Sequence, residues 1–185
     1  MIGAATPGAS IAQFAAAAGF HTILEDILPA SLRRAEADIR LAFERSIARG
    51  ASTRPAADAA LARIEYASSV EQAARAADLV IEAVPDELES KIEILTLLDK
   101  LSRPATIFAV SSPSFSVAEL AGVTYRAEKV LGMRFSLPLE KEELLEIVRT
   151  RETTDETVAA CAEAGRRMVR KVMVREEPPH VPAAR

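Results

Sequence analysis

The chain has 185 residues, of which 49% are hydrophobic and 27% charged. This composition is typical of one globular domain and excludes a disordered chain. The formal net charge of −4 and the absence of a basic run argue against a nucleic-acid surface. No stretch of 18 apolar residues appears, so we expect no membrane span and a cytoplasmic location.

The first feature along the chain is a glycine turn, GAATPG at residues 3–8, which follows a two-residue remnant of a strand. A helix rich in small residues is predicted over 9–18, and a strand at 21–24 leads to Asp26. A glycine turn, a helix and a strand ending in a carboxylate are typical of a Rossmann-type βαβ unit that binds a dinucleotide. The turn departs from the usual pattern at Ala5, where a second glycine is expected.

Strands and helices continue to alternate to the end of the chain. The run 79–84 is apolar without alternation, as in a strand buried on both faces. We therefore predict an α/β fold, a Rossmann-type doubly wound and mostly parallel sheet with helices on both faces. Residues 1–175 are predicted to form this domain, and 176–185 a Pro-rich tail or linker. Further helices are predicted at about 29–49, 55–63, 70–77, 88–98 and 154–169, with a short helix that begins at Val117, and further strands at 64–67, 107–110, 130–133, 144–148 and 172–174.

The one cysteine and the two histidines of the chain are poor candidates for chemistry. Cys161 excludes an internal disulfide and lies in an Ala-rich helical pattern, so we interpret it as a buried structural thiol. His21 is placed at the start of a strand and His180 in the tail, and we interpret both as incidental.

Several segments together resemble the NAD-binding domain of the L-3-hydroxyacyl-CoA dehydrogenase family, whose enzymes act in fatty-acid β-oxidation. They follow one another at the family's spacing, so the resemblance covers nearly the full chain. Beyond the glycine turn, the segments are VIEAVPDELESK (80–91), SFSVAEL (114–120), VLGMRF (130–135) and LLEIVR (144–149).

The resemblance implies NAD as the cofactor. Gly3 and Gly8 would form the turn whose N–H groups face the pyrophosphate, and the methyl group of Ala5 should weaken that contact. Asp26 would accept hydrogen bonds from the adenosine ribose and repel the 2′-phosphate of NADP; the alternative is an exposed loop acid. The residues assigned to the cofactor in this way are Gly3, Ala5, Thr6, Pro7, Gly8, Asp26, Asp86, Lys91 and Ser111.

Three of these residues lie beyond the glycine turn. Asp86 and Lys91 match positions that help to bind the nicotinamide half of the cofactor. The alternative is that they are a helix N-terminal acid and a solvated lysine. Ser111 falls where the family has an asparagine near the cofactor and the acyl-CoA.

The family reaction, oxidation of an L-3-hydroxyacyl-CoA to a 3-oxoacyl-CoA, requires a general base. Glu146 matches the glutamate that orients the family's catalytic histidine, but the histidine position holds Arg134 and the serine position holds Pro113. Arginine does not lose its proton near neutral pH, and proline has no hydroxyl. We expect Arg134 to pair with Glu146 instead.

Two functions from different classes remain open. The first is an NAD-dependent dehydrogenase, or the cofactor half of one, which Asp26, Glu82 and Glu146 favour. The second is a non-catalytic module that binds a nucleotide or an acyl-CoA, or serves as a scaffold, which the substitutions favour. A third possibility is a different hydroxyacid dehydrogenase relative that uses a lysine as its base. No lysine of this chain stands at a matching strand end. We expect the family's helical C-terminal domain to be missing, with a homodimer or a separate chain carrying that domain as implied partners, and no metal.

Overall fold

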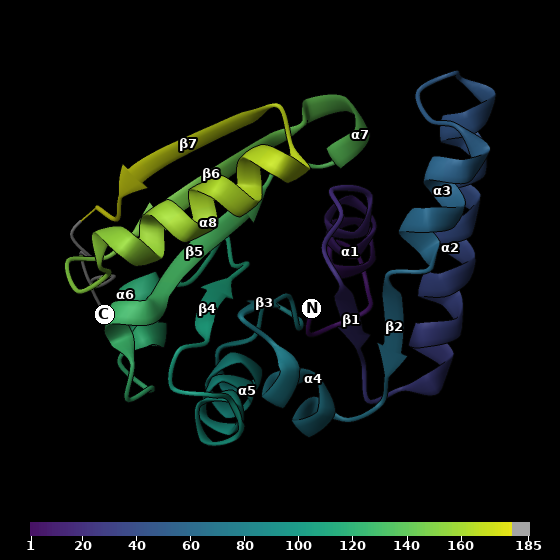
Figure 1. Ribbon diagram of the computed structural model, residues 1–185. Coiled ribbons are helices and arrows are strands. Elements are labelled where there is room, and N and C mark those ends of the chain that lie inside the picture. The colour runs from purple at the N-terminus through teal and green to yellow at the C-terminus, as the bar shows by residue number, and fades with distance from the viewer. Residues whose placement is uncertain (179–185) are drawn as a thin grey trace.

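A twisted central sheet runs through the computed structural model, with helices packed on both sides of it (Figure 1). The structure describes residues 1–178, without the side chains of Glu140 and Glu142. The strands are β1 (Thr22–Glu25), β2 (Ile64–Ala67), β3 (Leu79–Glu82), β4 (Ile107–Val110), β5 (Val130–Phe135), β6 (Leu144–Arg149) and β7 (Lys171–Glu176). The helices are α1 (Gly8–Ala17), α2 (Pro29–Ala48), α3 (Arg54–Leu61), α4 (Val70–Ala76), α5 (Leu88–Leu101), α6 (Val117–Ala121), α7 (Leu139–Glu142) and α8 (Asp155–Met168), with a 3₁₀ turn at Ala127–Lys129.

The sheet consists of two hydrogen-bonded parts joined at the start of the chain. One part is the pair β1–β2, and the other has the order β3-β4-β5-β6-β7. Ile2 forms parallel bridges to both Glu25 in β1 and Glu82 in β3. It therefore links the two parts and is all that the described chain contributes as a first strand.

Most neighbouring strands run parallel, as predicted. β1 and β2 are parallel, and so are β3, β4 and β5. β6 runs antiparallel to β5, and β7 follows β6 in parallel. The reversal matters for the site, because it places a residue near the start of β6 opposite the end of β5.

Both faces of the sheet are covered by helices, which confirms the doubly wound architecture. Val80 and Phe108 point to a core shared with α4, α5 and α6. Ile81 and Ala109, their neighbours in sequence, point to a core shared with α1 and α8. This alternation is the two-residue period of a strand, and both positions are apolar because both faces are buried.

Local signals explain where several elements start and stop. Pro29 opens α2, and Gly19 follows α1 with a φ of +92°, a value that favours glycine. The hydroxyl of Thr154 accepts the N–H of Thr157 and caps α8. Cys161 in that helix is 1% exposed, and burial raises its pKa to about 12, which confirms the structural thiol.

The last described residues pack against the domain. β7 extends through Glu176, and the carboxylate of Glu177 accepts the N–H groups of Val117 and Ala118 at 2.6 and 2.9 Å. The ordered contacts thus reach two residues past the predicted boundary at 175, while His180 lies outside the described residues. Within the described part, no helix is both long and apolar enough to cross a membrane.

Candidate cofactor site and active site

Polar groups gather at the carboxyl ends of four neighbouring strands. Asp26 directly follows β1, Asp86 follows β3, Ser111 follows β4, and Arg134 lies near the end of β5. The carboxyl ends of parallel strands meet at one edge of a sheet, where ligands of such folds bind. The tertiary structure therefore brings the sequence-predicted residues to one edge.

The two glycines of the turn are required by backbone packing. The N–H of Gly3 donates to the carbonyl of Glu25 at 2.9 Å. Gly3 has a φ of +96°, and a Cβ there would lie 2.7 Å from the Ala83 carbonyl oxygen. A Cβ on Gly8 would lie 1.9 Å from the carbonyl oxygen of Gly3. Both positions exclude any side chain, because the turn packs directly against itself and against the end of β3.

Asp26 holds the glycine turn against the end of β1. One carboxylate oxygen accepts the N–H of Ala4 at 3.0 Å, and the other accepts the N–H of Leu28 at 2.9 Å. Asp26 is half-buried, so it is not merely an exposed loop acid. A carboxylate offers about four acceptor positions, which leaves capacity for the hydroxyls of a ribose. The turn, the start of α1 and this carboxylate therefore fit the adenosine and pyrophosphate parts of NAD.

Lys91 is fully buried, so the alternative of a solvated lysine is wrong. Its Nζ lies 3.0 and 3.1 Å from the two carboxylate oxygens of Glu82 and 3.5 Å from the carbonyls of Val84 and Ser111. Burial raises the pKa of Glu82, although the Lys91 charge and its hydrogen bonds oppose the rise. No partner for Glu82 is predicted from the sequence. The available signal was an acid ending a fully apolar strand, with a lysine on the next helix.

Ser112 connects the ends of β3 and β4. Its hydroxyl donates to Asp86 at 2.7 Å and accepts the N–H groups of Ser114 and Phe115. Partial burial acts to raise the pKa of Asp86, but hydrogen bonds from Ser112 and Ser114 and the Lys91 charge outweigh it and lower the pKa. Ser111 directly follows β4, and its carbonyl lies 3.5 Å from the Nζ of Lys91; its assignment to the cofactor stays a prediction.

Arg134 and Glu146 are direct neighbours across the antiparallel pair β5–β6. The closest guanidinium nitrogen of Arg134 lies 3.8 Å from a carboxylate oxygen of Glu146, so the expected ion pair is present at the edge of the usual distance. The Nε of Arg134 donates to the carbonyl of Ser112 at 2.7 Å. Glu146 is bound more closely by Arg175, whose Nε and Nη2 lie 2.8 and 3.0 Å from its two oxygens. This contact of Arg175 follows from the pairing of β6 with β7, which the sequence pattern does not indicate.

The remaining candidates supply no base at this edge. Pro113 is exposed beside Ser112 and carries neither a hydroxyl nor an N–H. His21 lies next to the start of β1, at the opposite edge of the sheet, where its Nε2 is 3.0 Å from Glu65. Among residues 1–178, no group of three His, Cys, Asp or Glu side chains could hold a metal ion.

Comparison with known proteins gives one consistent family. The model for the NAD-binding domain of 3-hydroxyacyl-CoA dehydrogenase matches residues 1–177. A probable 3-hydroxybutyryl-CoA dehydrogenase of Bacillus subtilis (strain 168) is 34% identical over 155 residues, 84% of this chain and 54% of that protein. A 3-hydroxybutyryl-CoA dehydrogenase of Bradyrhizobium diazoefficiens is 34% identical over 179 residues, 97% of this chain and 61% of that protein.

The fold agrees with these matches. The crystal structure of (S)-3-hydroxybutyryl-CoA dehydrogenase PaaH1 from Ralstonia eutropha is similar with a TM-score of 0.92 at 31% identity, over 96% of this chain and 62% of that one. The chain thus spans between half and two thirds of the length of these relatives. The matching family model is that of an NAD-binding domain, so NAD is the cofactor. The chain belongs to the 3-hydroxyacyl-CoA dehydrogenase family and corresponds to its NAD-binding domain.

Proposed function

We propose that this chain binds NAD along the carboxyl edge of its sheet and that, by itself, it supplies no general base for the family reaction. The observation that carries the first half is the attachment of Asp26 to the glycine turn by the 3.0 Å bond from Ala4. This bond places a carboxylate beside the N-terminus of α1, where a ribose and a pyrophosphate would lie next to each other.

The residues of the edge would divide the binding of NAD among them. The start of α1 presents N–H groups and the positive end of its dipole to the pyrophosphate. Asp26 would bind the ribose hydroxyls and disfavour a 2′-phosphate. The charge of Lys91 is already matched by Glu82, so we assign Lys91 to holding the carbonyls of Val84 and Ser111 in place. Bound NAD would accept a hydride from a substrate hydroxyl carbon.

The second half of the proposal rests on the group that must take the hydroxyl proton. Arg134 occupies the position of the family's base, and its guanidinium stays protonated at neutral pH. Glu146 is engaged by two oxygen contacts from Arg175. We therefore favour a non-catalytic relative over an active L-3-hydroxyacyl-CoA dehydrogenase for this chain alone. Binding of acyl-CoA, a homodimer, a partner chain that completes the substrate site, and a cytoplasmic location remain proposals.

The binding half is tested by the ratio of the affinities for NAD and NADP. Asp26→Asn removes the charge that disfavours a 2′-phosphate, so we expect the preference for NAD to fall at least about tenfold. The measurement is calorimetric titration with each nucleotide. Asp38→Asn, an exposed acid on α2, is the matched control and should leave the ratio unchanged. Absence of NAD binding by the unchanged chain, or an unchanged ratio in Asp26→Asn, would reject this half.

The catalytic half is tested by oxidation of NADH with acetoacetyl-CoA. We expect no turnover above the rate without protein for the chain alone, because the position of the family's base holds Arg134 and the carboxylate of Glu146 is bound by Arg175. Turnover comparable to that of an intact family enzyme would refute the non-catalytic assignment without affecting the result on NAD binding.

A further inference from the structure

Arg134 has hydrogen-bonding capacity that its neighbours leave open. Its Nε donates to the carbonyl of Ser112 at 2.7 Å. Its closest contact with Glu146 is 3.8 Å, which is too long for a hydrogen bond. Among the groups that the structure describes, none accepts a hydrogen bond from Nη1 or Nη2 of Arg134. The side chain is 25% exposed, so the guanidinium is fixed at one end and reachable at the other.

The carboxylates near Arg134 are bound more closely by other cations. Arg175 holds the two oxygens of Glu146 at 2.8 and 3.0 Å. The carboxylate of Glu82 lies 3.0 Å from the Nζ of Lys91. Arg134 is therefore the most weakly paired of these three cations at the carboxyl edge, and its charge is available to a ligand.

The open side of the guanidinium selects a carboxylate. A guanidinium binds a carboxylate through two parallel N–H···O bonds. Because Nε is engaged, the edge formed by Nη1 and Nη2 is the one that can make this contact. A phosphate group carries more negative charge than a carboxylate, and the neighbouring Glu146 and Asp86 would repel it more strongly. A single negative charge fits this position best.

Apolar side chains lie on the same face of the sheet as Arg134. Arg134 pairs with Glu146 across β5 and β6, so Leu144, two residues before Glu146, is a diagonal neighbour on that face. Met173 is the partner of Glu146 on β7 and is 47% exposed. An alkyl chain attached to a carboxylate at Arg134 would cover this apolar surface.

We propose that Arg134 binds the carboxylate of a short-chain alkyl acid at the position of the family's base, with the alkyl chain over Leu144 and Met173. The inference extends the proposed function and rests on its second half. An arginine at this position holds an anion but does not accept the proton of a substrate hydroxyl. The binding requires no NAD.

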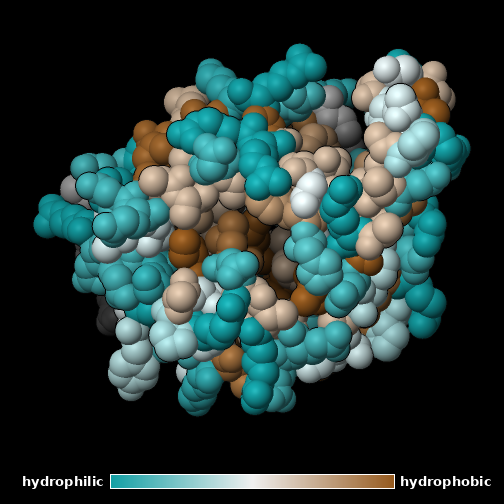
Figure 2. Space-filling view, in the orientation of Figure 1, coloured by the Kyte–Doolittle hydropathy of each residue, from teal (hydrophilic) through white to brown (hydrophobic). Residues whose placement is uncertain are grey.

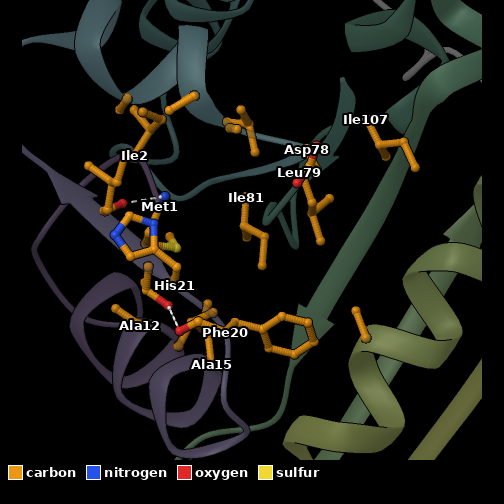
Figure 3. Close-up of a pocket in the computed structure, with 18 of the residues that line it drawn as sticks. Met1, Ile2, Ala12, Ala15, Phe20, His21, Asp78, Leu79, Ile81 and Ile107 are labelled. Carbon is orange, nitrogen blue, oxygen red and sulfur yellow. Dashed lines mark hydrogen bonds between the residues drawn. The ribbon is translucent and has the colours of Figure 1, made fainter. Parts of the chain in front are cut away.

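A hollow at the amino ends of the strands is the rival position for an alkyl chain. It has a volume of about 430 Å³, and Figure 2 shows a brown, hydrophobic interior near the middle of the visible face. Its lining is mainly apolar, as at Phe20, Leu79 and Ile107 (Figure 3). Arg134 does not belong to this lining, so substitutions can separate the two positions.

The test is a titration of the full chain with butyrate, at constant ionic strength and without nucleotide. We expect a saturable shift of the NMR signal of the Arg134 Nε–Hε group. Butyramide has the same shape but no charge, and it should bind at least about tenfold more weakly. Equal binding of butyrate and butyramide, or the absence of a saturable shift, would overturn the proposal.

Three variants test the role of the charge, with affinities taken from saturation-transfer NMR of the butyrate signals. Arg134→Gln should bind butyrate at least about tenfold more weakly. Arg33→Gln changes an exposed arginine on α2 and should have no effect. Glu146→Gln removes the nearest competing carboxylate and should strengthen binding about twofold to fivefold. Unchanged affinity in Arg134→Gln, or no gain in Glu146→Gln, would contradict the proposal.

A further variant locates the acid on the molecule. Ala160→Leu narrows the hollow from α8 and should leave the affinity for butyrate unchanged. If this variant weakens binding and Arg134→Gln does not, the acid binds in the hollow and the proposal is wrong.

The result is also separable from the enzyme assay with acetoacetyl-CoA. No turnover together with no butyrate binding rejects this inference alone. Turnover together with butyrate binding at Arg134 rejects the second half of the proposed function alone.

Discussion

Glu146 lies between two guanidinium groups. Arg175 holds both of its oxygens, while Arg134 comes within 3.8 Å of one of them. Glu146 is about a quarter exposed, so this cluster is only partly screened by water. A carboxylate in this state is not free to orient an imidazole. Restoring a histidine at 134 would therefore leave it without the acid that orients it.

This leads to a prediction on Arg134→His with and without Arg175. The pKa of the introduced imidazole should be about 1 unit higher in Arg134→His/Arg175→Gln than in Arg134→His, because Glu146 is then free to stabilise the protonated ring. The pKa is read from the imidazole proton shifts in an NMR titration. Arg166→Gln, which changes an exposed arginine paired with Glu163, is the control and should have no effect. Equal imidazole pKa values in the two variants would show that Arg175 does not prevent Glu146 from interacting with residue 134.

At the scale of elements, β3 and α5 are joined by a buried ion pair. Glu82 is the last residue of the strand, and Lys91 lies in the first turns of the helix with 0% exposure. Leu88 and Ile92, apolar residues of this helix, are 41% and 36% exposed. The buried face is formed by Lys91, Leu95 and Leu98 because the strand end offers the lysine a carboxylate and two carbonyls.

Removing one partner of this pair should cost much more than removing both. Lys91→Met leaves Glu82 buried without a cation, and we expect a loss of about 3 kcal/mol in the free energy of unfolding at pH 8. Glu82→Gln/Lys91→Met should recover most of it. The pKa of Glu82 is already raised, and it rises further without the lysine. The loss should therefore be smallest below the ordinary carboxyl pKa and grow as the pH rises through the folded pKa.

Urea unfolding of these variants at pH 5 and pH 8 provides the measurement. Lys100→Met, at an exposed position of the same helix, is the control and should change stability by less than about 0.5 kcal/mol. If the single and double variants lose equal stability, the ion pair does not join the two elements.

At the scale of the whole molecule, the two parts of the sheet meet at a seam that contains two unusual titratable groups. Burial and the neighbouring Asp26 raise the pKa of Glu25 to about 7, although the Met1 amine opposes this. Burial lowers the pKa of the Met1 amine to about 6. Both groups favour their neutral forms in the folded chain, since the seam keeps water away from them.

The seam predicts a pH dependence of global stability. Between pH 4.5, its ordinary pKa, and about pH 7, Glu25 takes up a proton when the chain folds. The free energy of unfolding should therefore fall by about 2 kcal/mol as the pH rises across this range. The Met1 amine binds its proton more tightly when unfolded, so stability should recover from about pH 6 to its ordinary pKa of 8.0. In thermal unfolding, Glu25→Gln should not show the loss of stability between pH 4.5 and about 7. Glu89→Gln, an exposed acid on α5, should retain it.

The fold was largely predictable from the sequence. The apolar runs that became β3 and β4, the glycine turn and the cap at Thr154 are local signals, and local signals determine elements. The family segments then predicted NAD and the residues of the carboxyl edge. Boundaries moved by one or two residues at several elements, as at β5 and β7, because strand ends depend on the neighbouring strand rather than on propensity.

The sequence by itself determined the α/β architecture, the family and the substitution of the catalytic histidine and serine positions by Arg134 and Pro113. Only the tertiary structure decided which charges meet: Lys91 with Glu82 and Arg175 with Glu146. It also decided that Ser112 joins Asp86. Pairings of this kind join residues from different elements, so they depend on register and on burial. Neither property is encoded in the spacing of residues along the chain.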